Sequence, residues 1–155
     1  MTTPSASSEA YILFELAGTT YALRSTEVKH LELVDQITPV PTAPPFVEGV
    51  VFSRGQVIPA INLRQRFGFP RQEHTLRSRL IVVESAGRTV GLLADAAREF
   101  RTIATASLQP PNESITGLSG QYLQGIAIVN ERLILILELK EVLAFVEKQN
   151  LVAVS

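Results

Sequence analysis

Residues that could perform catalysis or hold a metal are few and widely spaced in this chain. The two histidines, His30 and His74, lie far apart and outside any metal-ligand spacing. Cysteine is absent, which excludes disulfides, thiolate metal sites and cysteine nucleophiles. Carboxylates such as Glu32 and Asp35 have no second acid at helical spacing. The sequence therefore predicts no metal and no cofactor, although residues distant in sequence can still assemble a site in the fold.

Motifs for phosphate binding and for a serine nucleophile are also missing. Neither GxGxxG nor GxxxxGK[ST] occurs, and the segment GVVFSRG at 49–55 lacks the Lys-Ser/Thr ending of a phosphate loop. GxSxG does not occur either, since the nearest stretch, GLSG at 117–120, has the wrong spacing. We therefore expect no enzymatic activity, and an enzyme without a recognisable motif is the least favoured alternative.

Positive charge is concentrated in one stretch, although the whole chain has a net charge of −1. A run of arginines like this is typical of a solvated surface, and the more specific alternative is a docking patch for an acidic partner. Nucleic-acid binding by a small barrel needs aromatic residues interleaved with basic ones, and aromatics are 6% of the chain. A basic-patch barrel that binds nucleic acid is therefore kept as an alternative function. One acid, Glu73, lies among the six arginines, which are Arg54, Arg64, Arg66, Arg71, Arg77 and Arg79.

Length and composition indicate a globular protein without targeting signals. The chain has 155 residues, of which 46% are hydrophobic and 19% charged, which suits one compact unit or two small ones. The start MTTPSASSEA has neither a basic region nor an apolar run, so no signal peptide is indicated. No apolar stretch approaches the length of a membrane span. We expect a cytoplasmic protein with no insertion into the membrane.

Strand patterns dominate the chain. The segment at 28–34 alternates apolar and polar residues, 98–106 is a further strand candidate, and the proline-rich stretch at 38–45 predicts a rigid extended connector. Short helices are predicted at 63–68 and, amphipathic, at 139–148. Hairpins are predicted within 11–24, 46–63, 79–95 and 122–139, with turns at Gly18, Arg54-Gly55, Ala86-Gly87 and Asn130-Glu131.

The two halves of the chain repeat the same pattern. The turn at Gly18 matches that at Gly87 at an offset of 69 residues, and residues 46–67 match 122–143 at an offset of 76. Each half has roughly the strand count of a small barrel, and closure removes exposed strand edges. We predict two packed β-barrels, since neither would bury enough surface alone. The expected organisation is a disordered tail (1–9), one domain of two intertwined barrel subdomains (10–148) and a C-terminal tail (149–155).

The segment FVEGVVFSRGQVIPAINLRQRFG at 46–68 closely resembles the signature of the CheW family. The resemblance extends over about residues 10–148. It implies an all-β fold with a short C-terminal helix, in which two packed SH3-like five-stranded β-barrels enclose a hydrophobic groove. The matching residues are Phe46, Gly49, Val50, Arg54, Gly55, Val57, Ile58, Pro59, Leu63 and Arg64.

The resemblance implies a non-catalytic adaptor that couples the cytoplasmic tips of chemoreceptors to the CheW-like regulatory domain of a CheA-type histidine kinase. By motif match, Val28 and Leu31 resemble partner-contacting positions, and Gly49 and Arg54 resemble positions for receptor coupling. Structural alternatives stay open. Val28 and Leu31 point to opposite faces of a regular strand, so at least one is expected in the core. Gly49 could be required by a close backbone approach.

The chain also departs from the family pattern. The family usually has Glu at the position of His30, commonly paired with the signature arginine, and it usually has Asn-Leu in place of Phe52-Ser53 and Asp in place of Asn62. We predict that Glu32, which lies two residues after His30 on the same face of the strand, pairs with Arg54 instead. The departures leave open whether the pathway is flagellar chemotaxis, pilus motility or another. The predicted partner-binding residues are Val28, His30, Leu31, Glu32, Gly49 and Arg54.

Overall fold

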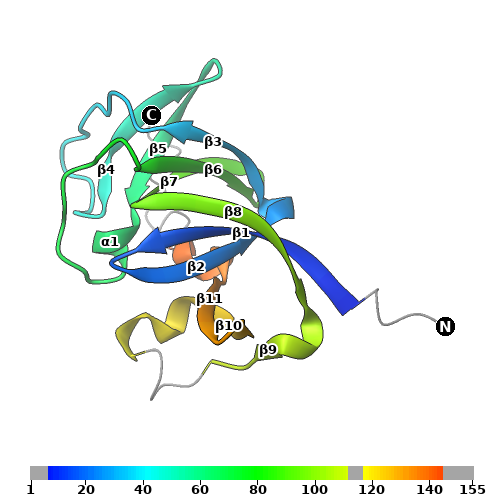
Figure 1. Ribbon diagram of the computed structural model, residues 1–155. Helices are drawn as coiled ribbons and strands as arrows, with labels where there is room; N and C mark the ends of the chain where they lie inside the picture. Colours follow the sequence, from blue (N-terminus) through cyan, green and yellow to red (C-terminus); the bar gives the residue numbers. More distant parts are fainter. Residues whose placement is uncertain (1–6, 112–116, 145–155) are drawn as a thin grey trace.

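The fold consists of two small β-sheets that curl into packed barrels, as seen in a computed structural model that describes residues 7–111 and 117–144 (Figure 1). One sheet has the order β8-β1-β2-β11-β10-β9 and the other has the order β3-β6-β7-β5-β4. The first contains β1 (Ser8–Leu16), β2 (Thr19–Arg24), β8 (Ala96–Ala104), β9 (Leu108–Gln109), β10 (Leu123–Val129) and β11 (Arg132–Leu137). The second contains β3 (Val28–Leu33), β4 (Val47–Ser53), β5 (Gln56–Asn62), β6 (Arg79–Ser85) and β7 (Arg88–Ala94).

The helical elements are short and lie between or after the strands. They are α1 (Leu63–Arg66), α3 (Leu139–Val142) and the 3-10 turns η2 (Ser25–Glu27), η3 (Thr105–Ser107) and η4 (Gly117–Tyr122). The first predicted helix is shorter than expected, α3 begins where the second was predicted, and the part of the second beyond Ala144 lies outside the described residues. β1 begins at Ser8, so residues 8 and 9 belong to a strand and not to the expected tail.

Four hairpins close through two-residue turns at the predicted positions. Both turn residues have positive φ in every case, which gives a backbone twist that matches the right-handed twist of the flanking strands. Glycine supplies the second position in three of the turns because it has no Cβ to clash in this conformation. The turns are Ala17-Gly18, Arg54-Gly55, Ala86-Gly87 and Asn130-Glu131.

Each sheet closes on itself. In the second sheet, Thr38 in the connector after β3 forms a bridge with Val50 of β4, through hydrogen bonds of 2.9 and 2.8 Å. In the first sheet, β9 follows β8 through η3 and pairs with β10, where Gln109 lies opposite Ile126. Val50 and Ile126 are 76 residues apart, so the same closure occurs at equivalent positions of the repeat. The prediction of two packed barrels is confirmed, with β9 as a sixth, two-residue strand in one of them.

The halves of the sequence exchange their hairpins. The β1–β2 hairpin of the first half pairs with β8 and β11 of the second, and the β6–β7 hairpin of the second half pairs with β3 and β5 of the first. The parallel pairs are equivalent in the repeat, since Ala22 opposite Ile136 corresponds to Gly91 opposite Ala60. Neither barrel therefore consists of one half of the chain.

Three apolar clusters form the core. The largest lies between the two sheets and includes Phe14, Leu23, Ile81 and Leu92 from both of them. A smaller cluster around Leu13 lies in the first sheet, and another around Ile58 lies in the second. Because the largest cluster is shared, each barrel supplies part of the other's buried surface.

Candidate functional site

A β-bulge in β3 decides which of its side chains are available to a partner. Val28 lies opposite Val83, whereas Leu31 lies opposite Ile81, and the register shifts between Val28 and His30. Directly opposite residues of an antiparallel pair share a face, and the bulge inserts one extra residue. Val28 and Leu31 therefore lie on the same face, which corrects the expectation from a regular strand.

Burial separates the two residues. Val28 is half-buried and packs against the core between the barrels, whereas Leu31 is 37% exposed and Leu33 is 66% exposed. Val28 thus has a structural role, and the outer end of β3 presents two leucines to solvent. Leu33 also lines a cavity of about 230 Å³ together with Phe52 of β4, so these two exposed side chains belong to one surface.

Phe52 is 75% exposed and lies opposite Val57, which is 55% exposed, in the β4–β5 hairpin. We call these four side chains the seam surface: Leu33 and Phe52 line the cavity between β3 and β4, Leu31 shares the outer face of β3 with Leu33, and Val57 of β5 lies opposite Phe52. Exposed apolar side chains that gather in one place are typical of a protein-binding site.

His30, Glu32 and Ser53 form a hydrogen-bonded cluster on the opposite face of β3. The His30 Nε2 atom lies 2.6 Å from Glu32 Oε2 and 3.3 Å from Ser53 Oγ, and the Ser53 hydroxyl donates to the same Glu32 oxygen. A nucleophile triad needs the acid on one imidazole nitrogen and the serine on the other. Here one nitrogen contacts both groups, so the cluster joins β3 to β4 and is not arranged for catalysis.

This cluster also fixes the charge of Glu32. Burial raises the pKa of the Glu32 carboxyl, but the hydrogen bonds from Ser53 and His30 and the charges of His30 and Arg54 outweigh it. The pKa of Glu32 therefore lies below its ordinary value, and the carboxylate is ionised at neutral pH.

Arg54 lies at the tip of the β4–β5 hairpin, where its side chain is exposed and its φ is 49°. Its charge helps to lower the pKa of Glu32. Among the described residues, however, no hydrogen bond and no ion pair within 4 Å joins Arg54 to Glu32. The pairing predicted from the sequence is therefore not formed, and the guanidinium faces solvent.

Gly49 is required by the closure of the barrel. A Cβ atom at this position would lie 2.1 Å from the carbonyl oxygen of Thr38 and 2.7 Å from its carbonyl carbon. Gly125, its equivalent in the repeat, has one such neighbour, the carbonyl oxygen of Gln109 at 3.1 Å. The close backbone approach considered for Gly49 is confirmed, and its role in receptor coupling stays a prediction.

The arginine stretch does not form a continuous basic surface, although Arg71 and Arg77 are more than half exposed. Five of the six guanidinium groups contact acceptors of the chain itself, so the predicted solvated face is found only in part, at the exposed Arg54, Arg71 and Arg77. Arg64, Arg71 and Arg77 pair with carboxylates, which lowers the net positive charge available to phosphates and weakens the case for nucleic-acid binding. The contacts are Arg64 with Asp95 (2.9 and 2.7 Å), Arg66 with the Val142 carbonyl (2.9 Å), Arg71 with Glu48 (3.3 Å), Arg77 with Glu15 (3.6 Å) and Arg79 with the carbonyls of Leu76 and Ser78 (2.8 and 2.9 Å).

His74 contacts a carboxylate, although its side chain is still 25% exposed. Its Nε2 atom lies 2.8 Å from an oxygen of Glu48, whose side chain is 8% exposed. The other Glu48 oxygen accepts a hydrogen bond of 2.9 Å from Asn62, whose own side chain caps α1 by accepting from the Gln65 N–H. Glu48 therefore ties the linker after α1 to the second barrel.

A second exposed apolar pair lies on the other barrel. Ile128 and Leu133 are directly opposite each other in the β10–β11 hairpin, and each is 46% exposed. They are the repeat equivalents of Phe52 and Val57 at the offset of 76 residues. Neither exposed pair was predicted from the sequence. The repeat contained the signal, because its alignment places apolar residues at matching positions near the turns of both hairpins.

Two kinds of site are not found among residues 7–111 and 117–144. No group of three or more His, Cys, Asp or Glu side chains is placed to hold a metal ion. No helix in this part of the chain is long and apolar enough to cross a membrane.

Two intertwined barrels that present exposed apolar pairs, with no catalytic arrangement in the described residues, define a scaffold of the protein-binding class. The chain belongs to the CheW-like domain family, whose model matches residues 10–147. The family and fold predicted from the sequence are thereby confirmed, and with them the class of function, a non-catalytic scaffold of chemotaxis signalling.

Curated relatives and a solved structure agree with this assignment. The chain is 30% identical to the chemotaxis protein CheW of Bacillus subtilis (strain 168) over 143 residues, which are 92% of each chain. It is 28% identical to the chemotaxis protein CheW of Rhizobium meliloti (strain 1021) over 138 residues, 89% of each chain. The crystal structure of the scaffolding protein TtCheW from Thermoanaerobacter tengcongensis matches with a TM-score of 0.78 at 33% identity, over 84% of this chain and 88% of that one.

Proposed function

We propose that this chain is a cytoplasmic adaptor that binds a chemoreceptor tip and the regulatory domain of a CheA-type histidine kinase at the same time, through different barrels. The observation that carries the proposal is the pair of exposed apolar surfaces at equivalent hairpins of the repeat. An adaptor must hold two partners without competition between them. Two separate surfaces on two barrels meet that requirement.

The seam surface is the proposed receptor site. Leu31 and Leu33 supply apolar area at the outer end of β3, and Arg54 at the neighbouring hairpin tip supplies a cation with no hydrogen bond or ion pair to another described residue. An arginine with free donors suits recognition of a carboxylate on the partner. His30 and Glu32 lie on the opposite face and support this site by joining β3 to β4, instead of contacting the receptor.

The Ile128–Leu133 pair is the proposed kinase site. It lies on the β10–β11 hairpin, away from the closure of the second barrel, so a domain docked there leaves the seam surface accessible. Interfaces derive most of their affinity from a few buried apolar or aromatic side chains, and the pair has the character of such an anchor.

Separate binding measurements with each purified partner test the proposal. Leu31→Asp should weaken binding of a receptor cytoplasmic fragment by at least about a hundredfold, because an unpaired carboxylate would be buried in the interface. The same variant should leave affinity for the kinase regulatory domain unchanged. Leu133→Asp should show the reverse pattern.

Leu76→Asp is the matched control, since Leu76 is 94% exposed but isolated on the linker before β6. It should affect neither partner. Loss of both partners in either single variant would show that the sites overlap and would refute the two-surface arrangement. Wild-type affinity for both partners in all three variants would remove these surfaces from the function altogether.

A further inference from the structure

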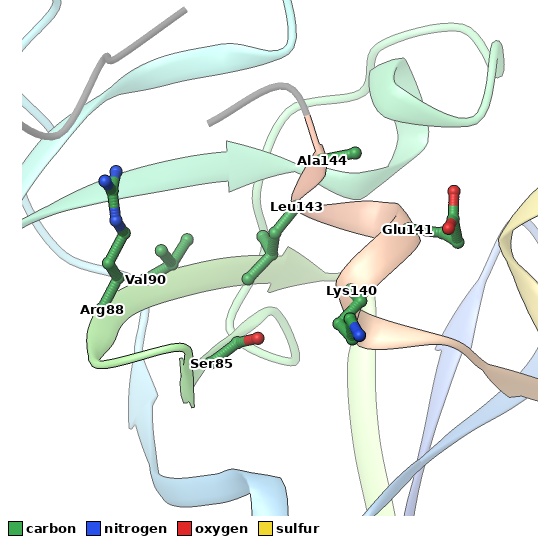
Figure 2. Close-up of a pocket in the computed structure, with 7 residues that line it drawn as sticks. All are labelled: Ser85, Arg88, Val90, Lys140, Glu141, Leu143 and Ala144. Carbon is green, nitrogen blue, oxygen red and sulfur yellow. The ribbon is translucent and has the colours of Figure 1, made fainter. Parts of the chain in front are cut away.

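A pocket of about 180 Å³ lies between the β6–β7 hairpin and α3 (Figure 2), and none of its lining residues belongs to the seam surface. Its walls carry two cations, Arg88 at the start of β7 and Lys140 in α3, and Figure 2 shows them at opposite ends of the pocket. The buried side chains of Val90 and Leu143 lie between them. The pocket therefore combines an apolar floor with a positive charge at each end.

The cations of this pocket have no acid to pair with among the described residues. The Nη1 atom of Arg88 is buried and makes no hydrogen bond. Lys140 forms no ion pair within the described chain. Glu141 also lines the pocket, but Figure 2 shows its carboxylate pointing away from Arg88 on the other side of α3. Buried guanidinium N–H groups normally have an acceptor, so Arg88 indicates a site for one.

The internal repeat shows what such a position accepts. Lys140 is equivalent to Arg64 at the offset of 76 residues, and the turn residue Ala86 is equivalent to Ala17 at the offset of 69. In the first half, Arg64 donates to both oxygens of Asp95 at 2.9 and 2.7 Å, and the Ala17 N–H donates to the same carboxylate at 2.9 Å. A helix cation and a hairpin turn thus hold a protein carboxylate there.

The pocket keeps the helix cation and the hairpin turn of that arrangement and adds Arg88. We propose that it binds a segment of a partner protein in which two acidic side chains bracket one apolar side chain. One carboxylate pairs with Lys140 as Asp95 pairs with Arg64, the apolar side chain covers Val90 and Leu143, and the second carboxylate pairs with Arg88. Charge complementarity and the protein carboxylate at the equivalent position favour an acidic peptide over an uncharged one.

Titration of the full ¹⁵N-labelled chain with the blocked octapeptide GSELSEGS tests the proposal by NMR. Saturable shifts should be confined to the amides of the β6–β7 turn, the start of β7 and α3. The control peptide GSQLSQGS, which keeps the shape but lacks the charges, should cause no such shifts. Arg88→Gln and Lys140→Gln should each weaken the binding of the acidic peptide by about threefold or more.

Lys29→Gln is the matched variant, because it removes an exposed cation from β3, which does not line the pocket. It should leave the affinity unchanged. The proposal is overturned if GSELSEGS causes no saturable shifts, if the control peptide binds equally well, or if Lys29→Gln weakens binding as much as Arg88→Gln does. The Leu31→Asp variant should bind the peptide normally, which separates this site from the proposed receptor site.

Discussion

Replacement of Gly49 by alanine tests how the second barrel closes. The added Cβ would lie 2.1 Å from the Thr38 carbonyl oxygen and 2.9 Å from Ile37 Cγ2, so the connector after β3 has to move by about 1 Å to restore normal contact. That movement breaks the two backbone hydrogen bonds between Thr38 and Val50. Each such bond contributes about 1 kcal/mol, and overpacking costs about 1–3 kcal/mol more. We expect Gly49→Ala to lower the free energy of unfolding by about 3–5 kcal/mol.

Urea unfolding followed by far-UV circular dichroism measures this loss, with Gly125→Ala as the control. Gly125 occupies the same position in the other half of the repeat, but its added Cβ has one neighbour, at 3.1 Å, which a shift of a few tenths of an ångström relieves. Alanine also lowers the entropy of the unfolded chain, which offsets about 0.4–1 kcal/mol of that cost. The control should therefore lie within about 1 kcal/mol of wild type.

Equal stabilities for the two alanine variants would refute this reasoning, since Gly49 has both the closer contacts and a positive φ, of 158°, that Gly125 lacks. A Gly49→Ala protein with wild-type stability that failed to bind the receptor fragment would instead assign Gly49 to the interface. The structural role predicts that binding and stability fall together.

Three further outcomes follow from the same contacts. Leu31→Asp should fold with a melting temperature within about 4 °C of wild type, by differential scanning calorimetry, because the side chain is partly exposed; an unfolded variant would place Leu31 in the core. A double-mutant cycle of Glu32→Gln and Arg54→Gln, read by receptor affinity, should give a coupling below about 0.5 kcal/mol, and a larger value would show a direct pair. Burial raises the pKa of the Asp95 carboxyl, but hydrogen bonds from Arg64 and the Ala17 N–H outweigh it, so this pKa lies below its ordinary value. The stability that the carboxylate contributes is therefore present above about pH 4 and is lost as the pH falls through the lowered pKa. Acid unfolding of Asp95→Asn should lack this loss of stability.

Local features of the fold could be predicted from the sequence because they depend on short-range chemistry. The four turns needed only residues that tolerate positive φ between apolar runs, and the repeat offset aligned Gly49 with Gly125, each of which the structure places after a β-bulge. The exchange of hairpins could not be found in this way. A strand pattern shows which face is buried, but it does not show which of two similar hairpins a strand pairs with.

The candidate site was predictable in part for the same reason. Arg54 lies at the hairpin tip that the turn pattern predicted, and Leu31 is partly exposed, while their role in partner binding stays a prediction. The bulge in β3 was not visible in its alternating residues, so the shared face of Val28 and Leu31 was missed. The partners of the arginines were missed as well, because Asp95 and Glu48 lie many residues away from the side chains that they hold.

The exchange of hairpins bears on how the adaptor can hold two partners. Arg66 of α1 lies 4.8 Å from the centroid of the Phe46 ring and 4.9 Å from that of Tyr122, which is the repeat equivalent of Phe46. It also donates to the Val142 carbonyl of α3, so one cation joins corresponding elements of both halves. Rotation of one barrel against the other would break these contacts and expose the shared core. We therefore expect the seam surface and the Ile128–Leu133 pair to keep a fixed spacing, so that this scaffold organises its partners by geometry and not by changing shape.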